Sequence, residues 1–104
     1  MKPKIVAHVR KSELEELAQF FHQDFEIAFE SVTEGANEHF RSLTFEQRRA
    51  LISELRQVLQ DHLGKSKRGL QNAWRRLGAQ YWNRKIDLAS SMSSWVAELE
   101  RSTA

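Results

Sequence analysis

Three times in its first half the chain places Ser or Thr three residues ahead of Glu or Gln, at Ser12–Glu15, Ser31–Glu34 and Thr44–Gln47. In such a capping box the hydroxyl accepts a hydrogen bond from the third helical amide, while the Glu or Gln side chain reaches back to the capping residue. Each box therefore predicts the first turn of a helix. With only one proline and four glycines in the chain, a fold built on many tight turns is disfavoured.

Apolar residues repeat at helical spacing in four segments. These stripes are Leu14, Leu17, Ala18 and Phe21; Leu51, Ile52, Leu55, Val58, Leu59 and Leu63; Leu70, Ala73, Trp74, Leu77 and Tyr81; and Met92, Trp95, Val96 and Leu99. We therefore expect an all-α fold, a compact single-domain bundle of about five short helices. Its expected core contains Phe21, Leu55, Leu59, Trp74, Leu77 and Trp95.

Glycines and serines suggest where the helices begin and end. Gly64 suits the position just past the end of the third helix, and Gly78 either ends the fourth helix or marks a close backbone approach. Residues 83–89 are predicted as a loop, and the serines of 90–94 favour a helix start. Residues 1–11 are basic and are expected to be extended or poorly ordered, which leaves 12–102 as the helical domain.

Composition also bears on the cellular compartment. The chain has no cysteine, which excludes disulfides and thiolate-bound metal. The apolar stretch at 5–7 is far shorter than the core of a signal peptide, and no run approaches the roughly 18 apolar residues of a membrane span. These features predict a cytoplasmic protein that does not enter a membrane.

Charge is strongly segregated along the chain. Residues 12–40 carry eight acids and no Lys or Arg, whereas residues 62–86 carry seven bases and no acid. Within the first stretch Glu26, Glu30, Glu34 and Glu38 recur every four residues. Such segregation favours either a charged partner or internal pairing of the two blocks. Gly35 and the Ser31 cap predict a break in the acidic line.

Catalytic motifs are largely missing. The glycines at 64 and 69 have the spacing of a phosphate-binding loop, but Leu70 and Gln71 stand where Lys and a hydroxyl residue are needed. His22 and Asp24 could form an acid–base pair, although a polar helix end explains them more simply. The histidines lack metal-ligand spacing. We expect no enzyme activity, cofactor, metal or small-molecule substrate.

Nucleic-acid binding is the alternative function. The basic segment, residues 65–85, contains Trp74, Tyr81 and Trp82, and bases with aromatic residues can hold phosphates and stack nucleobases. However, Trp74 and Tyr81 fall on the apolar stripe, which predicts that they belong to the core. We therefore expect nucleic acid to bind only weakly.

One motif resembles a known family. The stretch 17–25, Leu-Ala-Gln-Phe-Phe-His-Gln-Asp-Phe, is similar to the opening motif of the small immunity proteins of bacterial contact-dependent growth inhibition systems. Further matches, in the family's order, are Glu54-Leu55, Leu77-Gly78 followed by Tyr81, and Trp95-Val96 with Leu99. Together the matches extend over nearly the whole chain. The chain departs from the family pattern at Phe25, where Trp is common, and by lacking a proline after Tyr81.

This resemblance implies an all-helical cytoplasmic protein without catalytic activity. It would bind, as a 1:1 complex, the C-terminal toxin domain that a sibling cell delivers, commonly a nuclease, and neutralise it. Because a nuclease holds a polyanion, its cleft is usually basic, and carboxylates suit an inhibitor that covers it. The toxin-binding residues hypothesised on this ground, here called the acidic segment, are Asp24, Glu26, Glu30, Glu34 and Glu38.

Overall fold

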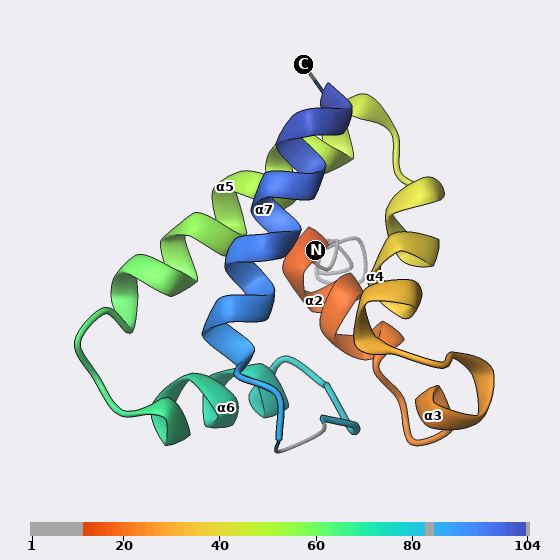
Figure 1. Ribbon diagram of the computed structural model, residues 1–104. Coiled ribbons are helices and arrows are strands. Elements are labelled where there is room, and N and C mark those ends of the chain that lie inside the picture. The colour runs from red at the N-terminus through yellow and green to blue at the C-terminus, as the bar shows by residue number, and fades with distance from the viewer. Residues whose placement is uncertain (1–11, 83–84, 104) are drawn as a thin grey trace, which may run out of the picture.

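The computed structural model describes residues 12–82 and 85–103, and in these ranges the protein is helical with no strand. Figure 1 shows the arrangement. The helices are α2 (Glu13–Phe20), α3 (Phe25–Ala28), α4 (Val32–Arg41), α5 (Phe45–Asp61), α6 (Lys67–Arg76) and α7 (Leu88–Thr103). The all-α prediction is confirmed, with α3 as the additional short helix. The expectation for residues 1–11 lies outside the described residues.

Two of the three predicted capping boxes form completely. Ser12 and Thr44 each accept a hydrogen bond from the third helical amide and receive the reciprocal side-chain contact. At the second box only half of the motif forms, because Ser31 accepts from the Glu34 amide at 3.0 Å while Glu34 Oε1 accepts from the Glu30 amide at 2.7 Å. The box therefore starts α4 as predicted, but ties it to the connector that precedes it.

The last helix starts earlier than its serines suggested. α7 begins at Leu88, within the stretch predicted to be a loop. The Asp87 carboxylate accepts hydrogen bonds from the Ser90 amide at 3.0 Å and from the Ser90 hydroxyl at 2.8 Å. A carboxylate satisfies the free amides of a first helical turn as well as a hydroxyl does, so Asp87 sets the start of this helix.

The buried stripe of α5 is shorter than the sequence predicts. The helix ends at Asp61, and Leu63, predicted to be on the buried face, is 73% exposed. Gly64 follows with φ +77°, a left-handed conformation that glycine adopts without strain. It turns the chain toward α6 as expected, but three residues beyond Asp61, the last residue of the regular helix.

The helical stripe of α6 is also shorter than the sequence predicts. α6 ends at Arg76, so Tyr81 does not lie on the helix. Gly78, with φ +116°, turns the chain back, and the amides of Gln80 and Tyr81 then donate to the Phe21 carbonyl at 2.8 and 2.9 Å. The end of α2 and the segment after α6 are thereby joined.

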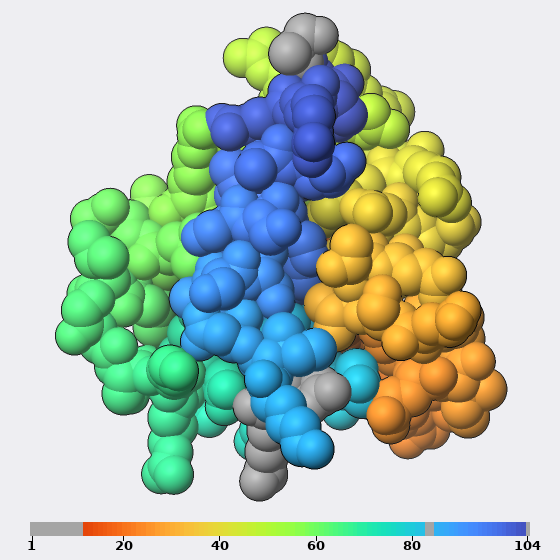
Figure 2. Space-filling view, viewed as in Figure 1, coloured from red at the N-terminus to blue at the C-terminus, as the bar shows by residue number. Residues whose placement is uncertain are grey.

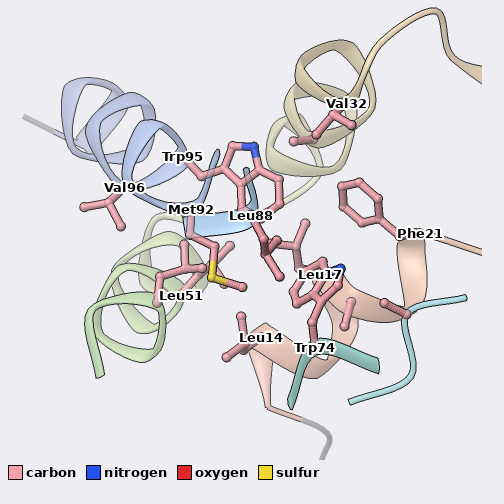
Figure 3. Packing of buried hydrophobic residues seen from close by; sticks show 14 of the residues in the cluster. Leu14, Leu17, Phe21, Val32, Leu51, Trp74, Leu88, Met92, Trp95 and Val96 are labelled. Atoms are coloured by element: carbon pink, nitrogen blue, oxygen red, sulfur yellow. The ribbon is translucent and has the colours of Figure 1, made fainter. Parts of the chain in front are cut away.

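The core lies where α2, α5, α6 and α7 meet. α7 packs along α5 and contacts α6, while α2 contacts α5 and α4. Figure 3 shows side chains from these helices converging, among them Leu17, Leu51, Trp74 and Met92. Of the predicted core residues, Phe21, Leu55, Trp74 and Trp95 are buried, whereas Leu59 and Leu77 are partly buried against the same cluster.

An aromatic layer links this core to α3 and α4. The ring of Phe25 stacks between Phe21, at 4.4 Å, and Tyr81, at 5.3 Å between ring centroids. A Cβ atom on Gly35 would lie only 2.1 Å from Phe25 Cζ. Of the two features that predicted a break in the acidic line, Gly35 makes none, since α4 runs through it. Glycine at this position lets α4 lie against the Phe25 ring.

Candidate functional site

All five carboxylates of the acidic segment face solvent. Asp24 precedes α3, Glu26 is in α3, Glu30 lies in the connector, and Glu34 and Glu38 are in α4. In Figure 2 these elements form the orange-to-yellow side of the molecule, next to α7. The fold therefore leaves this whole segment accessible to a partner.

The structure brings only some of these residues together. Glu34 contacts the backbone of Glu30, and Glu38 lies one turn further along α4. Glu26 is on a separate helix, because the backbone at Phe29 is extended with φ −134° and ψ 143°. The predicted break in the acidic line is therefore confirmed: it lies at Phe29, just before the Ser31 cap that helped to predict it, and not at Gly35.

Pairing of the acidic segment is local. Glu38 accepts from Arg41 Nη1 at 2.6 Å, with both side chains more than half exposed, and such exposed pairs contribute little to stability. Glu34 stands in the first turn of α4, where the helix dipole favours negative charge. No ion pair between described residues joins the five carboxylates of the acidic segment to a base of residues 65–82.

An exposed apolar residue lies within the acidic segment. Ile27 on α3 is 86% exposed, next in the chain to Glu26 and three residues before Glu30. It was not singled out in the sequence, although helical spacing places it away from Phe25 and Phe29. A bare isoleucine beside carboxylates is a surface on which apolar burial and charge could act together.

The motif 22–24 is a polar turn. The Asp24 amide donates to His22 Nδ1 at 3.2 Å, and the Gln23 amide donates to Gln80 Oε1 at 3.2 Å. The two side chains of His22 and Asp24 make no acid–base pair. These contacts hold the turn after α2 against the segment that follows α6, and so they position α3.

Among the described residues, three groups have shifted pKa values. Burial lowers the pKa of His39, whose ring lies 5.0 Å from that of Phe20, and the nearby Glu16 opposes the shift. Burial raises the pKa of Tyr81, and Glu26 adds to this. Hydrogen bonds from Ser90 hold the pKa of Asp87 below its ordinary value, supported by Lys67. Each shift reflects packing or capping.

The protein has a pocket beside α6. It has a volume of about 360 Å³ and opens between α6 and the segment 79–82. Gln71 and Arg75 of α6 line one wall, and Gln80, Tyr81 and Trp82 line the other. Trp74, predicted for the core, also lines the pocket but is only 2% exposed. The helical stripe predicted from the sequence contains Trp74 and Tyr81 but not Trp82, and it does not predict the pocket that these residues line.

The described residues contain no group of three or more acidic or histidine side chains arranged to hold a metal ion. None of the helices described is both long enough and apolar enough to cross a bilayer. Comparison of the chain with models of known families, with curated proteins and with solved structures finds no match.

Proposed function

We propose that this chain is an immunity protein that binds the toxin domain of a contact-dependent growth inhibition system and neutralises it, the toxin being a nuclease. The observation that carries the proposal is the exposed acidic segment around Ile27, which has no base of residues 65–82 paired with it. The resemblance of the motif at 17–25 supports the same function. A cytoplasmic location and a 1:1 complex belong to this proposal.

Charge and apolar burial have separate roles in the proposed complex. Complementary charge mainly raises the association rate and selects the partner, and the acidic segment suits a basic nuclease cleft. Burying an isoleucine contributes about 1.5–3 kcal/mol, so Ile27 suits an apolar socket on the toxin and mainly slows dissociation. The two contributions can therefore be measured separately.

The charge contribution is tested by reversing Glu26 and Glu30. These two carboxylates are exposed, and neither side chain accepts a backbone hydrogen bond from a described residue, whereas Glu34 accepts one from the Glu30 amide. The protein with Glu26→Lys and Glu30→Lys should associate at least tenfold more slowly with the toxin domain and fail to protect cells. A control with Glu46→Lys and Asp61→Lys changes net charge equally at exposed sites on α5. Equal slowing in both proteins would show that the position of the charge is irrelevant and contradict the proposal.

The apolar contribution is tested at Ile27. Ile27→Ala should weaken affinity about tenfold, which corresponds to about 1.4 kcal/mol, mostly through faster dissociation. Leu63→Ala is the matched control, because Leu63 is 73% exposed and follows α5, on the opposite side of the molecule from α3 in Figure 1. Unchanged affinity of Ile27→Ala would place the interface elsewhere.

The toxin domain for these tests is defined by gene order. The proposal expects a large secreted filamentous protein with a variable C-terminal domain encoded immediately upstream, and that domain is the binding probe. Co-expression with this chain should restore growth of cells that produce the toxin domain. A metabolic operon at this place, or a failure to restore growth, would contradict the immunity function.

The alternative function uses the basic segment. Arg68, Arg75 and Arg76 are exposed on α6, but Trp74 is committed to the core. We therefore expect weak binding of tRNA and duplex DNA at physiological salt in a fluorescence titration. Submicromolar binding with a steep salt dependence would favour nucleic-acid binding over the immunity function.

A further inference from the structure

The pocket between α6 and the segment 79–82 plays no part in the proposed toxin contact. Its volume of about 360 Å³ falls within the range of small-molecule sites, which is roughly 300–1,000 Å³. A duplex cannot enter a hollow of this size. The pocket therefore calls for a small ligand or a single projecting group.

One wall of the pocket is aromatic. Tyr81 and Trp82 are both half-buried. Tyr81 stacks on Phe25 on its core side, with ring planes 16° apart, and Trp82 is held by a hydrogen bond from Nε1 to the Ile86 carbonyl at 3.0 Å. These rings are therefore fixed in place while part of each remains accessible. Fixed aromatic surfaces are suited to stacking a planar ring.

The opposite wall carries an arginine with no acidic partner. Arg75 is exposed and forms no ion pair with a residue of the described ranges. Arg68 lies seven residues earlier on α6, so that both arginines share one helical face with Gln71 between them. A guanidinium of this kind is suited to bidentate contact with a phosphate.

Each wall of the pocket also carries one amide side chain, Gln71 beside Arg75 and Gln80 beside Tyr81. Gln71 is half-buried and makes no hydrogen bond with a described residue, and Gln80 uses only its Oε1 atom, which accepts from the Gln23 amide. Amides offer donors and acceptors together, which is what the edge of a nucleobase requires.

We propose that this pocket binds one nucleotide, with the base against Tyr81 and Trp82, the base edge at the two glutamines, and the phosphate at Arg75. Glu26 lies near Tyr81, so the phosphate belongs at the arginine end, away from that carboxylate. The ligand is either a free nucleoside monophosphate or an unpaired nucleotide of a single strand. None of the residues that line this site belongs to the proposed toxin contact.

The test is titration of the full chain with AMP, adenosine, inorganic phosphate and an oligoadenylate of four nucleotides. Calorimetry and amide NMR monitor the binding of each probe. AMP should bind with Kd below about 1 mM and shift the side-chain amide signals of Gln71 and Gln80. Arg75→Ala should weaken AMP about tenfold and leave adenosine unchanged. Arg76→Ala, an adjacent exposed arginine that does not line the pocket, should leave AMP binding within about twofold.

The outcomes separate the sources of the ligand. Equal affinity for AMP and the oligoadenylate assigns the site to a free nucleotide, and tighter binding of the oligoadenylate with dependence on Arg68 assigns it to a single strand. No binding of any probe at about 10 mM, or equal weakening by Arg75→Ala and Arg76→Ala, would overturn the proposal. It would also be wrong if the toxin domain, but no nucleotide, shifted the signals of Gln71 and Gln80.

Discussion

Substituting Gly35 by alanine tests the packing that positions the acidic segment. The new Cβ atom would lie 2.1 Å from Phe25 Cζ, whereas carbon atoms in contact stand about 3.5–4.0 Å apart. The ring must therefore give way by about 1.4 Å. It has little room to do so, because Phe25 is 1% exposed and is stacked on both Phe21 and Tyr81.

The expected cost is the difference between two opposing effects. Forcing extra volume into a packed core costs about 1–3 kcal/mol, and the tightness of this contact argues for the upper end. Replacing glycine by alanine inside a helix returns about 1 kcal/mol. Gly35→Ala should therefore destabilise the protein by about 2 kcal/mol, a decrease in Tm of roughly 8–16 °C for a domain of this size.

Urea denaturation of the wild type and of four variants, namely Gly35→Ala, Gly69→Ala, Phe25→Leu and the combination of Gly35→Ala with Phe25→Leu, measures this effect. Gly69→Ala is the matched control, since its Cβ would meet nothing closer than His62 Cδ2 at 3.7 Å, and it should be as stable as the wild type or more so. Combining Gly35→Ala with Phe25→Leu should cost less than the sum of the single changes, because the smaller side chain relieves the clash. A Gly35→Ala protein as stable as the wild type would refute the contact between α4 and the Phe25 ring.

Three further predictions concern stability. Trp74→Ala should lower the free energy of unfolding by about 3–5 kcal/mol, and an unchanged urea midpoint would contradict its burial. Asp87→Ala should cost about 1 kcal/mol by removing the cap of α7, with a loss of helical circular dichroism on heating at a lower temperature. Burial holds the pKa of His39 in the folded protein below its ordinary value of 6.5, so the unfolded chain binds a proton there at a higher pH than the folded protein does. The free energy of unfolding should therefore keep its full value above pH 6.5 and decrease as the pH falls from 6.5 toward the lower pKa of the folded protein. In His39→Gln the urea midpoint should change less between pH 7.5 and pH 5.5 than it does in the wild type. An equal change in both proteins would show that other groups cause the pH dependence.

The helices that the sequence predicted well have signals that are local. Ser12 and Thr44 cap their helices through contacts three residues away, and Leu55 and Trp95 repeat with the helix on one face. Such features depend on the neighbouring residues alone. The sequence does not predict α3 as a separate helix, because its four residues are too few to show a helical period.

The errors arise where distant parts of the chain decide the conformation. Glycine within a helical pattern is compatible with a break or with a close approach, and only the position of Phe25 shows that Gly35 serves the second. Tyr81 continues the α6 stripe in spacing, but the chain has already turned at Gly78 and is held by the Phe21 carbonyl.

The acidic segment could be predicted from local sequence, whereas the exposure of Ile27 and the pocket beside α6 could not. The run of carboxylates could be read directly from the sequence, since charged side chains are usually exposed. The exposure of Ile27 depends on which face of a one-turn helix meets the core. The pocket depends on the meeting of α6 with a segment that returns to α2, and no local pattern predicts that meeting.

The most direct test of the proposed toxin-binding face is an NMR titration of the ¹⁵N-labelled protein with the toxin domain that the proposal expects to be encoded upstream. The account predicts that the largest amide shifts fall within residues 22–38, centred on Ile27, and that Glu26→Lys with Glu30→Lys removes them at the same toxin concentration. Shifts concentrated in Lys67–Arg76 instead, with residues 22–38 unmoved, would show that the toxin binds the basic side of the molecule and would contradict the account.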